Sequence, residues 1–241
     1  MMKTFNELQE RVYDPNIFKA FFLAGGPGSG KSFVAGKVIG RGTGLKVVNS
    51  DDAFEHLLKK AGLSMRMPES ERERRDVVRD RAKVITALKQ GNYLEGRLGL
   101  IIDGTGAKSD KLLRQKGHLE ELGYDTYMVF VNTSLDVALE RNTKRARSVP
   151  ESIVVKAWKD VQANIGRFNN AFKGANMIIV DNNNVKENIF GEVSKRVRGL
   201  LRNKVKNQRA KEWMATEIAK RKRAPLEKRV AGEKKFLTKF V

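Results

Sequence analysis

Short apolar runs alternate along this chain with segments in which apolar residues recur every three or four positions. The apolar runs predict five strands, at residues 20–24, 45–49, 98–103, 127–131 and 177–180. The periodic segments predict helices over 32–39, from Asp51 through Leu58, from Pro68 to about residue 89, from 109 or 110 to 123, and from Ser134 onward. Because strands and helices alternate, we expect an α/β fold, a three-layer sandwich whose mostly parallel five-stranded sheet lies between helices.

The two longest periodic segments differ in how much surface they are expected to bury. Segment 68–89 is highly charged and its apolar positions are sparse, which indicates a surface helix. The later segment begins with Ser148-Val149-Pro150-Glu151, which fits a capping box and predicts a helix start. Val154, Trp158 and Phe168 lie on one stripe of that helix, and we interpret them as core residues.

The first predicted strand leads into a glycine-rich loop of the form G-x-x-x-x-G-K-[ST]. The loop is Gly25-Gly26-Pro27-Gly28-Ser29-Gly30-Lys31-Ser32, and segment 32–39 continues it as a helix. In such a loop, successive backbone N–H groups surround a phosphate chain, and the helix N-terminus favours negative charge. Lys31 is then placed to neutralise the β- and γ-phosphates of ATP, and the Ser32 hydroxyl to ligate Mg²⁺. An ordinary glycine-rich turn is the alternative, but all four diagnostic positions are filled, so we predict a nucleoside triphosphate site.

The composition is unusual for its positive charge. The 241 residues carry a formal net charge of +20, with a pI near 10.2. This excess indicates attraction to polyanions, nucleic acid first and anionic membrane second, although solubility alone is an alternative reason. The chain has no cysteine, which excludes disulfides, thiolate zinc sites and thiol catalysis, and fits the cytoplasmic location that we expect. No apolar run is long enough to span a membrane, and the N-terminus has no secretory pattern.

The positive charge is concentrated towards the C-terminus. Residues 201–241 hold fourteen Lys or Arg and four Glu, which is half of the net charge. The pattern beyond about residue 184 is helical, with breaks at Pro225 and Gly232. We therefore predict a P-loop domain over residues 1–195 and a basic helical tail over 196–241 that binds nucleic acid and is poorly ordered without it. Trp213 would either stack on a base or anchor the tail to the body.

Two aspartates follow predicted strands, at the edge of the sheet where ligands of open α/β folds bind. Asp51, in Asn49-Ser50-Asp51-Asp52, is a candidate to orient an acceptor hydroxyl and accept its proton. The alternative is that Asp51 only caps the next helix. Asp103 ends the strand 98–103 as a Walker B carboxylate does, which makes it a candidate Mg²⁺ ligand, or else part of an ordinary Asp-Gly turn.

A basic segment, residues 141–147, separates two predicted helices. Arginines in a mobile segment of this kind, here Arg141 and Arg145, are suited to a lid that closes over a triphosphate. The alternative is a solvated charge run that is favoured by the helix C-terminus. His56 and His118 each lack a second ligand at metal spacing, so we expect both on helix surfaces.

Taken in order, these motifs resemble the kinase domain of bacteriophage polynucleotide kinases and the related zeta toxins. The likeness covers about residues 18–182 and is strongest at the glycine-rich loop and at 141–150, where Arg141-Asn142-Thr143-Lys144-Arg145 is soon followed by Val149-Pro150. It implies a P-loop kinase that uses ATP and Mg²⁺. It further implies that Asp51 is the general base, that Arg141 and Arg145 are lid residues on the donor phosphates, and that Asp103 supports the site.

One position departs from the pattern that the resemblance implies. The family usually has an arginine three residues after the base, where it contacts the phosphate of the acceptor, but this chain has Phe54. Either the acceptor is different, or another basic residue such as Lys59 takes that role. The region after residue 184 has no counterpart in the family, and the chain has no D-x-D-G-T phosphatase motif.

Three functions are open on this evidence. The first is an ATP-dependent kinase that transfers the γ-phosphate to a hydroxyl of a nucleic acid or nucleotide, which the basic charge favours. The second is a zeta-toxin-like kinase of a nucleotide sugar, or a mononucleotide kinase, which Phe54 keeps open. The third is a nucleotide-dependent protein that binds nucleic acid or assembles with a partner through its tail.

Overall fold

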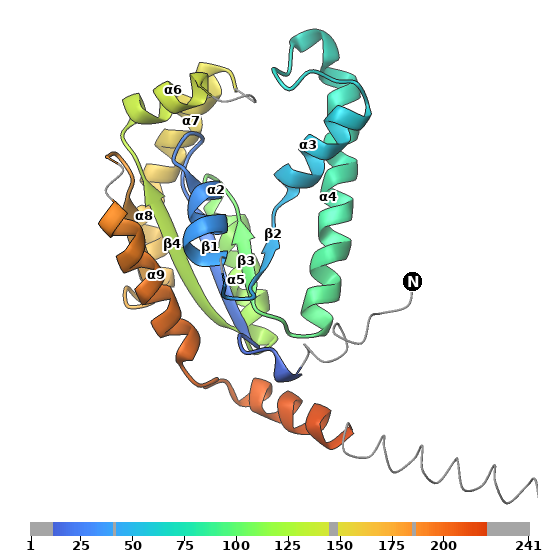
Figure 1. Ribbon diagram of the computed structural model, residues 1–241, viewed down its shortest axis with the longest axis vertical. Coiled ribbons are helices and arrows are strands. Elements are labelled where there is room, and N and C mark those ends of the chain that lie inside the picture. The colour runs from blue at the N-terminus through green and yellow to red at the C-terminus, as the bar shows by residue number, and fades with distance from the viewer. Residues whose placement is uncertain (1–11, 41, 145–148, 185–186, 221–241) are drawn as a thin grey trace, which may run out of the picture.

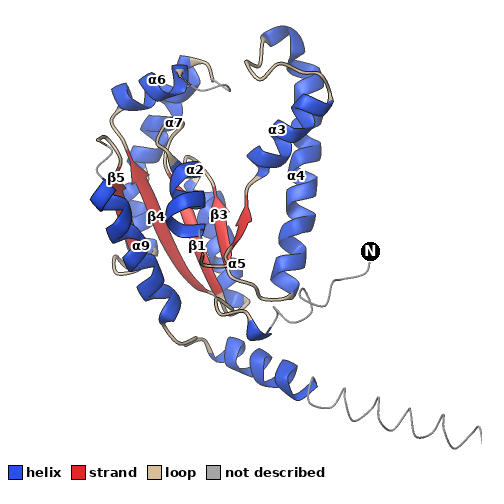
Figure 2. Cartoon of the chain, in the orientation of Figure 1, coloured by secondary structure: helices blue, strands red, loops and turns tan. Residues whose placement is uncertain are grey.

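The computed structural model describes residues 12–40, 42–144, 149–184 and 187–220 of the chain. Within these ranges the backbone forms one parallel sheet with helices on both faces (Figures 1 and 2). The strands are β1 (Lys19–Ala24), β2 (Lys46–Val48), β3 (Leu100–Asp103), β4 (Asp125–Asn132) and β5 (Met177–Asp181). Their order is β2-β3-β1-β4-β5, and each neighbouring pair is parallel. All five predicted strands are confirmed, with ends that differ by at most two residues.

Helical segments connect the strands, as the periodic pattern predicts. They are α2 (Lys31–Phe33), the π-helical turn η1 (Val34–Gly40), α3 (Ser50–Lys60), the 3₁₀ turn η2 (Glu69–Glu71), α4 (Arg72–Glu95), α5 (Ser109–Glu121), α6 (Leu135–Thr143), α7 (Glu151–Ala163), α8 (Ile165–Ala171) and α9 (Glu187–Arg202). Residues 208–220 are also helical. None of the helices within the described ranges has both the length and the apolar character needed to cross a bilayer.

Both faces of the sheet are buried, which is why its strands read as unbroken apolar runs. Along β1, Ala20 and Phe22 belong to one core cluster, whereas Phe21 and Leu23 belong to another. The first cluster is completed by residues of α5, α7, α8 and the 208–220 helix, and the second by residues of η1 and α9. Since successive side chains of a strand point to opposite faces, the two clusters lie on the two sides of the sheet. The predicted three-layer α/β fold is therefore confirmed.

Helices α3 and α4 form a hairpin beside the sheet, which we call the arm (residues 50–95; Figure 1). The arm has a small core of its own, made by Phe54, Leu58, Leu63 and Ala82. On α4, large apolar side chains such as Leu88 are exposed. The predicted surface character of α4 is therefore confirmed.

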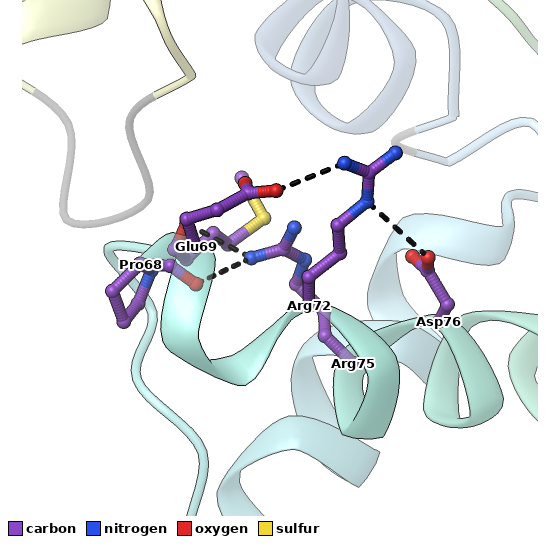
Figure 3. A network of polar contacts seen from close by, with 6 residues as sticks. Pro68, Glu69, Arg72, Arg75 and Asp76 are labelled. Atoms are coloured by element: carbon purple, nitrogen blue, oxygen red, sulfur yellow. Dashed lines mark hydrogen bonds and ion pairs between the residues drawn. The ribbon is translucent and has the colours of Figure 1, made fainter.

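Two arginines make hydrogen bonds at the tip of the arm, the turn between α3 and α4 (Figure 3). Met67 has a left-handed φ of 53°, and Arg75 donates hydrogen bonds to the carbonyls of Met67 (2.9 Å) and Pro68 (3.0 Å). Arg72 donates to Glu69 (2.9 Å), and this hydrogen bond raises the pKa of Arg72 above its usual value. Because Arg72 and Glu69 are both exposed, their pair adds little stability. The fixed turn at the tip therefore depends mainly on Arg75.

The start of α7 differs from the predicted capping box. The helix begins at Glu151 with Pro150 at its N-cap, two residues later than the pattern of Ser148 and Glu151 indicates. Ser148 itself lies outside the described residues. A proline disfavours helical backbone at the residue before it, so the helix does not extend back through Val149. The predicted single helix is also divided, because α7 ends at Ala163 and α8 begins at Ile165.

Part of the predicted tail packs on the body. Ala210 is fully buried, and the Trp213 ring lies edge-on to Phe18 with centroids 5.5 Å apart. The Arg97 guanidinium lies over the same Trp213 ring, at 5.7 Å. The structure thus supports the anchoring interpretation of Trp213 for the described part of the tail. Helix α9 runs through residue 195, the domain boundary stays a prediction, and residues 221–241 lie outside the described residues.

We expect Trp213→Ala to lower the free energy of unfolding by about 2 kcal/mol, because it opens a space beside Phe18 and Arg97. Urea unfolding measures the change. The control is Leu88→Ala on α4, whose side chain is 67 % exposed and whose loss should stay within about 0.5 kcal/mol. Equal small losses in both variants would show that the 208–220 helix is not anchored by Trp213.

Candidate active site

The glycine-rich loop leaves β1, the middle strand of the sheet, at its carboxyl end. The loop is tied to the end of β3, because the Gly25 N–H donates to the Thr105 carbonyl at 2.9 Å. At its other end, the N–H groups of Phe33 and Val34 donate to the Gly30 carbonyl at 3.1 and 3.2 Å, which begins α2. The backbone therefore turns from strand to helix within the predicted eight residues.

Three glycines of the loop have backbone angles or surroundings that exclude a side chain. The φ values are 151° at Gly25, 78° at Gly28 and 88° at Gly30. A Cβ at Gly25 would lie 2.6 Å from the Val131 carbonyl at the end of β4, one at Gly28 would meet the backbone of α6, and one at Gly30 would meet the Asn182 amide. The loop thus fits between three other elements only because it lacks side chains there.

Lys31 and Ser32 stand at the start of α2, as the motif predicts. The Lys31 ammonium donates to the carbonyls of Gly25 (2.6 Å) and Gly26 (3.1 Å), so it lies across the loop that would receive a phosphate chain. The Ser32 side chain is exposed at the first turn of the helix. This arrangement places a cation and a hydroxyl at a helix N-terminus, where anions bind.

Asp103 lies at the same edge of the sheet, level with Leu23 of β1. Its carboxylate accepts a hydrogen bond from the Asn49 amide at 3.0 Å. The hydroxyl of Ser32 and the carboxylate of Asp103 are hard oxygen donors, which fit Mg²⁺, an ion that usually takes only one or two protein carboxylates and keeps water and phosphate ligands. Within the described ranges no group of three or more His, Cys, Asp or Glu could hold a metal.

Asn49 also caps α3, because its Oδ1 accepts the Asp51 N–H at 2.8 Å. Asp51 is therefore the second residue of the helix rather than its cap, and the capping interpretation of Asp51 is wrong. The Asp51 carboxylate instead accepts a hydrogen bond from Arg79 of α4, at 2.7 Å. Arg79 in turn lies over the Phe54 ring, with its guanidinium carbon 4.6 Å from the ring centre. The ion pair joins the two helices of the arm at its junction with the sheet.

Arg141 and Asn182 bound the loop on the side of β4 and β5. Asn182 donates to the Ser29 carbonyl at 2.7 Å, and Arg141 donates to the Asn183 carbonyl at 3.4 Å. Asn182 Oδ1 and Arg141 Nη1 are buried, and neither has a hydrogen-bond partner in the described part of the chain. Buried polar atoms without partners are costly and are commonly explained by a bound ligand or water. These two atoms are therefore consistent with a ligand beside the loop.

The ends of the predicted lid are held together at their base. Asn142 donates to the Val149 carbonyl at 2.8 Å and accepts the Val149 N–H at 3.1 Å. In the same helix, the hydrogen bond from Lys144 to Glu140 lowers the pKa of the Glu140 carboxyl. Arg145, the second predicted lid arginine, lies outside the described residues, so its role stays a prediction.

Two residues, Trp158 and Lys59, do not lie where the sequence predicts them. Trp158 belongs to neither core cluster of the sheet. Its backbone lies beside Gly26 of the loop, and its indole N–H donates to the Thr133 carbonyl at 2.7 Å. Lys59, suggested as a substitute for the missing arginine, is exposed near the end of α3. His56 and His118 are exposed on their helices, as expected.

Two residues of this site were not predicted, Arg79 and Asn182. Arg79 is one of many charged residues in α4, and only its place opposite Asp51 distinguishes it. Asn182 follows the last strand, in the run Asn182-Asn183-Asn184. Residues directly after a buried strand lie at the edge where ligands bind, and this position could have indicated Asn182.

Comparison with protein families identifies one match: residues 6–192 fit the model described as "Zeta toxin". Among solved structures, a proposed kinase from Chloroflexus aurantiacus J-10-fl has a TM-score of 0.54 at 17 % identity, over 75 % of this chain and 97 % of that one. The AvrRxo1-ORF1:-ORF2 complex with ATP has a TM-score of 0.55 at 16 % identity, over 72 % of this chain and 57 % of that one. At these identities the two structures show the fold alone. A comparison with curated proteins finds no match.

We expect Gly28→Ala to weaken ATP binding by about 10- to 100-fold, because a Cβ at this left-handed position strains the backbone and meets α6. Isothermal titration calorimetry with ATP measures the loss. The control is Gly36→Ala in η1, where a Cβ would have no neighbour within 4 Å, and which should bind ATP as the parent does. Unchanged affinity in the Gly28 variant would mean that ATP does not use this loop.

Proposed function

This chain belongs to the zeta toxin family, and we propose that it is a kinase that transfers the γ-phosphate of ATP to a hydroxyl of a nucleic acid or nucleotide. One observation carries the proposal. The glycine-rich loop with Lys31 follows β1, and Asp51 follows β2; these strands lie on either side of β3, and both segments leave the sheet at its carboxyl edge. A donor cradle and an acceptor-side carboxylate at one edge are what phosphoryl transfer requires.

On the donor side, the backbone N–H groups at the end of the loop and the start of α2, residues 30–32, would hold the phosphates of ATP. Lys31 would leave the carbonyls of Gly25 and Gly26 and neutralise the β- and γ-phosphates. The Ser32 hydroxyl and the Asp103 carboxylate would hold Mg²⁺, which when bound supplies charge neutralisation on the phosphate oxygens. Arg141 would contribute its buried Nη1 to the donor, and Arg145 would complete the lid.

On the acceptor side, Asp51 would accept the proton of the attacking hydroxyl. Asn49 caps the helix, and the Asp51 carboxylate accepts a hydrogen bond from Arg79. A carboxylate at the start of a helix is also stabilised in its charged form by the helix dipole, which suits a group that must begin the reaction deprotonated.

We expect Asp51→Asn to lower turnover by about 10²- to 10⁴-fold, the range typical for loss of general acid–base catalysis. ATP affinity should change little, because the carboxylate lies on the acceptor side. Steady-state kinetics and calorimetry measure the two effects, with Asp52→Asn, an exposed neighbour in the same helix, as the control. A large loss of ATP affinity would assign Asp51 to the donor or its metal instead.

The acceptor is identified by a labelling experiment. The protein is incubated with γ-labelled ATP and, separately, with 5′-hydroxyl DNA, 5′-hydroxyl RNA, mononucleotides and UDP-sugars. Label on a nucleic acid or mononucleotide supports the proposal, and label only on a UDP-sugar supports a nucleotide-sugar kinase. The Lys31→Ala variant is the control and should label none. If ATP is hydrolysed without labelling any acceptor, the kinase proposal is wrong.

A second function, binding of nucleic acid apart from catalysis, is favoured by the distribution of charge. The segment 193–211 contains no acidic residue, and its basic side chains are all exposed; we call them the basic ridge, namely Lys195, Arg196, Arg198, Arg202, Lys204, Lys206, Arg209 and Lys211. Lys204 and Lys206 line a cavity together with Asp125 at the amino end of β4. This part of the ridge is therefore remote from the carboxyl edge that holds the loop. A polyanion bound there would be held at a distance from the transferred phosphate.

We expect replacement of Lys195, Arg198 and Arg202 by Gln to weaken DNA binding at low salt and to reduce the slope of log K against log salt by about 2.7, if all three contact phosphates. The three lie on one exposed face of α9. Fluorescence anisotropy with a labelled oligonucleotide measures the slope. The control replaces three exposed lysines of the arm, Lys60, Lys83 and Lys89, and removes the same charge elsewhere. Equal effects in both variants would show that only net charge matters.

A further inference from the structure

We propose that Arg79 binds a phosphate group of the acceptor and thereby holds the adjacent hydroxyl beside Asp51. This inference rests on the proposed kinase function and names its substrate class: a hydroxyl compound that carries a phosphate next to the hydroxyl that is phosphorylated. The phosphate can belong to a mononucleotide, to a nucleotide sugar or to the backbone of a nucleic acid strand.

Arg79 lies beside the proposed base and is in contact with solvent. Its guanidinium is 2.7 Å from the carboxylate that we assign as the base, and its side chain is 35 % exposed. A group that touches both Asp51 and solvent stands where the acceptor must enter. The pair also comes from two different helices, α3 and α4, so the position of Arg79 is set by the packing of the arm rather than by a flexible loop.

Arg79 has more N–H donors than its hydrogen bond to Asp51 uses. A guanidinium has five N–H donors in a fixed planar fork. Within the described part of the chain, Arg79 uses one nitrogen, Nη1, in a single hydrogen bond to Asp51. The remaining donors can bind a phosphate in a two-point contact without breaking that bond, since Arg–phosphate pairs are frequently bidentate. One guanidinium can therefore bridge the base and the anion of the acceptor.

Phe54 supports the guanidinium of Arg79. The Phe54 side chain is buried with Leu58, Leu63 and Ala82, and its ring lies under the Arg79 guanidinium at 4.6 Å. An aromatic ring under a guanidinium fixes the plane of the fork and adds a favourable cation–π contact. The residue that replaces the expected arginine at position 54 thus supports an arginine from the next helix.

An ion pair that only joins the two helices is the competing explanation. A half-exposed pair of this kind contributes little to stability. It would also make no distinction between acceptors with and without a phosphate. The two explanations therefore predict different results in a binding experiment that involves no chemistry.

The experiment saturates the glycine-rich loop of the full chain with a non-hydrolysable ATP analogue and Mg²⁺, and then titrates four acceptors by calorimetry. Three carry a phosphate: thymidine 3′-monophosphate, a 5′-hydroxyl oligothymidylate and UDP-N-acetylglucosamine. The fourth is thymidine, which carries none. We expect one or more of the three to bind more tightly than thymidine, and the strongest identifies the source of the phosphate.

Arg79→Ala should weaken that binding by about 10- to 100-fold, the loss of charge-assisted hydrogen bonds to one phosphate. Thymidine binding should be unchanged. Arg79→Lys, which keeps the charge and its pairing with Asp51 but loses the fork, should give an intermediate loss and remains informative if the alanine variant does not fold. The matched control is Arg81→Ala, an exposed arginine two residues along α4, which should bind as the parent does.

Equal affinity of the parent for thymidine and for all three phosphate compounds would overturn the proposal. So would an equal loss of binding in the Arg79 and Arg81 variants. Because no phosphate is transferred in this experiment, its result is separate from the labelling test. Binding that depends on Arg79, together with no labelled product, would retain the anchor and reject the kinase.

Discussion

The geometry of the whole site depends on how closely the backbone of the glycine-rich loop approaches its neighbours. The loop passes between the end of β4, the backbone of α6 and the amide of Asn182, and a Cβ at three of its positions would collide with one of them. These neighbours belong to three segments of the chain, and their places are fixed by the parallel sheet and its two buried faces. The sheet therefore fixes the space that is open to the loop, and at these three positions only glycine fits into that space.

Much of this arrangement can be predicted from the sequence because it depends on local patterns. Each strand is an apolar run in the sequence because both of its faces are buried. The loop is recognised from its own eight residues. The carboxyl ends of β1, β2 and β3 meet at one edge whatever the details of packing, which is why Asp51 and Asp103 could be selected in advance. The pairing of Asp51 with Arg79 joins residues 28 positions apart on two helices, and no local pattern encodes it. The predicted start of α7 is wrong because a local pattern was followed there too. Pro150 disfavours helical backbone at residue 149, so the capping pattern that starts at Ser148 does not begin the helix.

The donor side and the acceptor side that we propose differ in how they are built. The donor side is part of the main core, where the loop, Asn182 and Arg141 are linked by hydrogen bonds to strand ends. The acceptor side belongs to the arm, which has a separate small core and a turn fixed by Arg75. A residue of the arm can therefore be exchanged without disturbing the phosphate loop. Phe54 fits this view, because its ring packs in the core of the arm and supports Arg79 of α4, which we propose takes the place of the arginine expected at position 54.

The basic residues of the chain are also found in two separate places, the carboxyl edge of the sheet and the basic ridge. Binding of ATP needs a few cations at the carboxyl edge, and we propose that Lys31 and Arg141 supply them there. The basic ridge reaches the amino end of the strands, beside Asp125, where it cannot contact that nucleotide. The anchoring of Trp213 on Phe18 holds the second part of the ridge in place. A nucleic acid strand bound to the ridge would raise the concentration of its own hydroxyl groups near Asp51, provided that the strand is long enough to reach this residue. The ridge and the site at Asp51 would then act as two linked binding sites. A small acceptor gains nothing from such a surface, so the proposed roles of the ridge and of Arg79 together correspond to a substrate that is both phosphorylated and long.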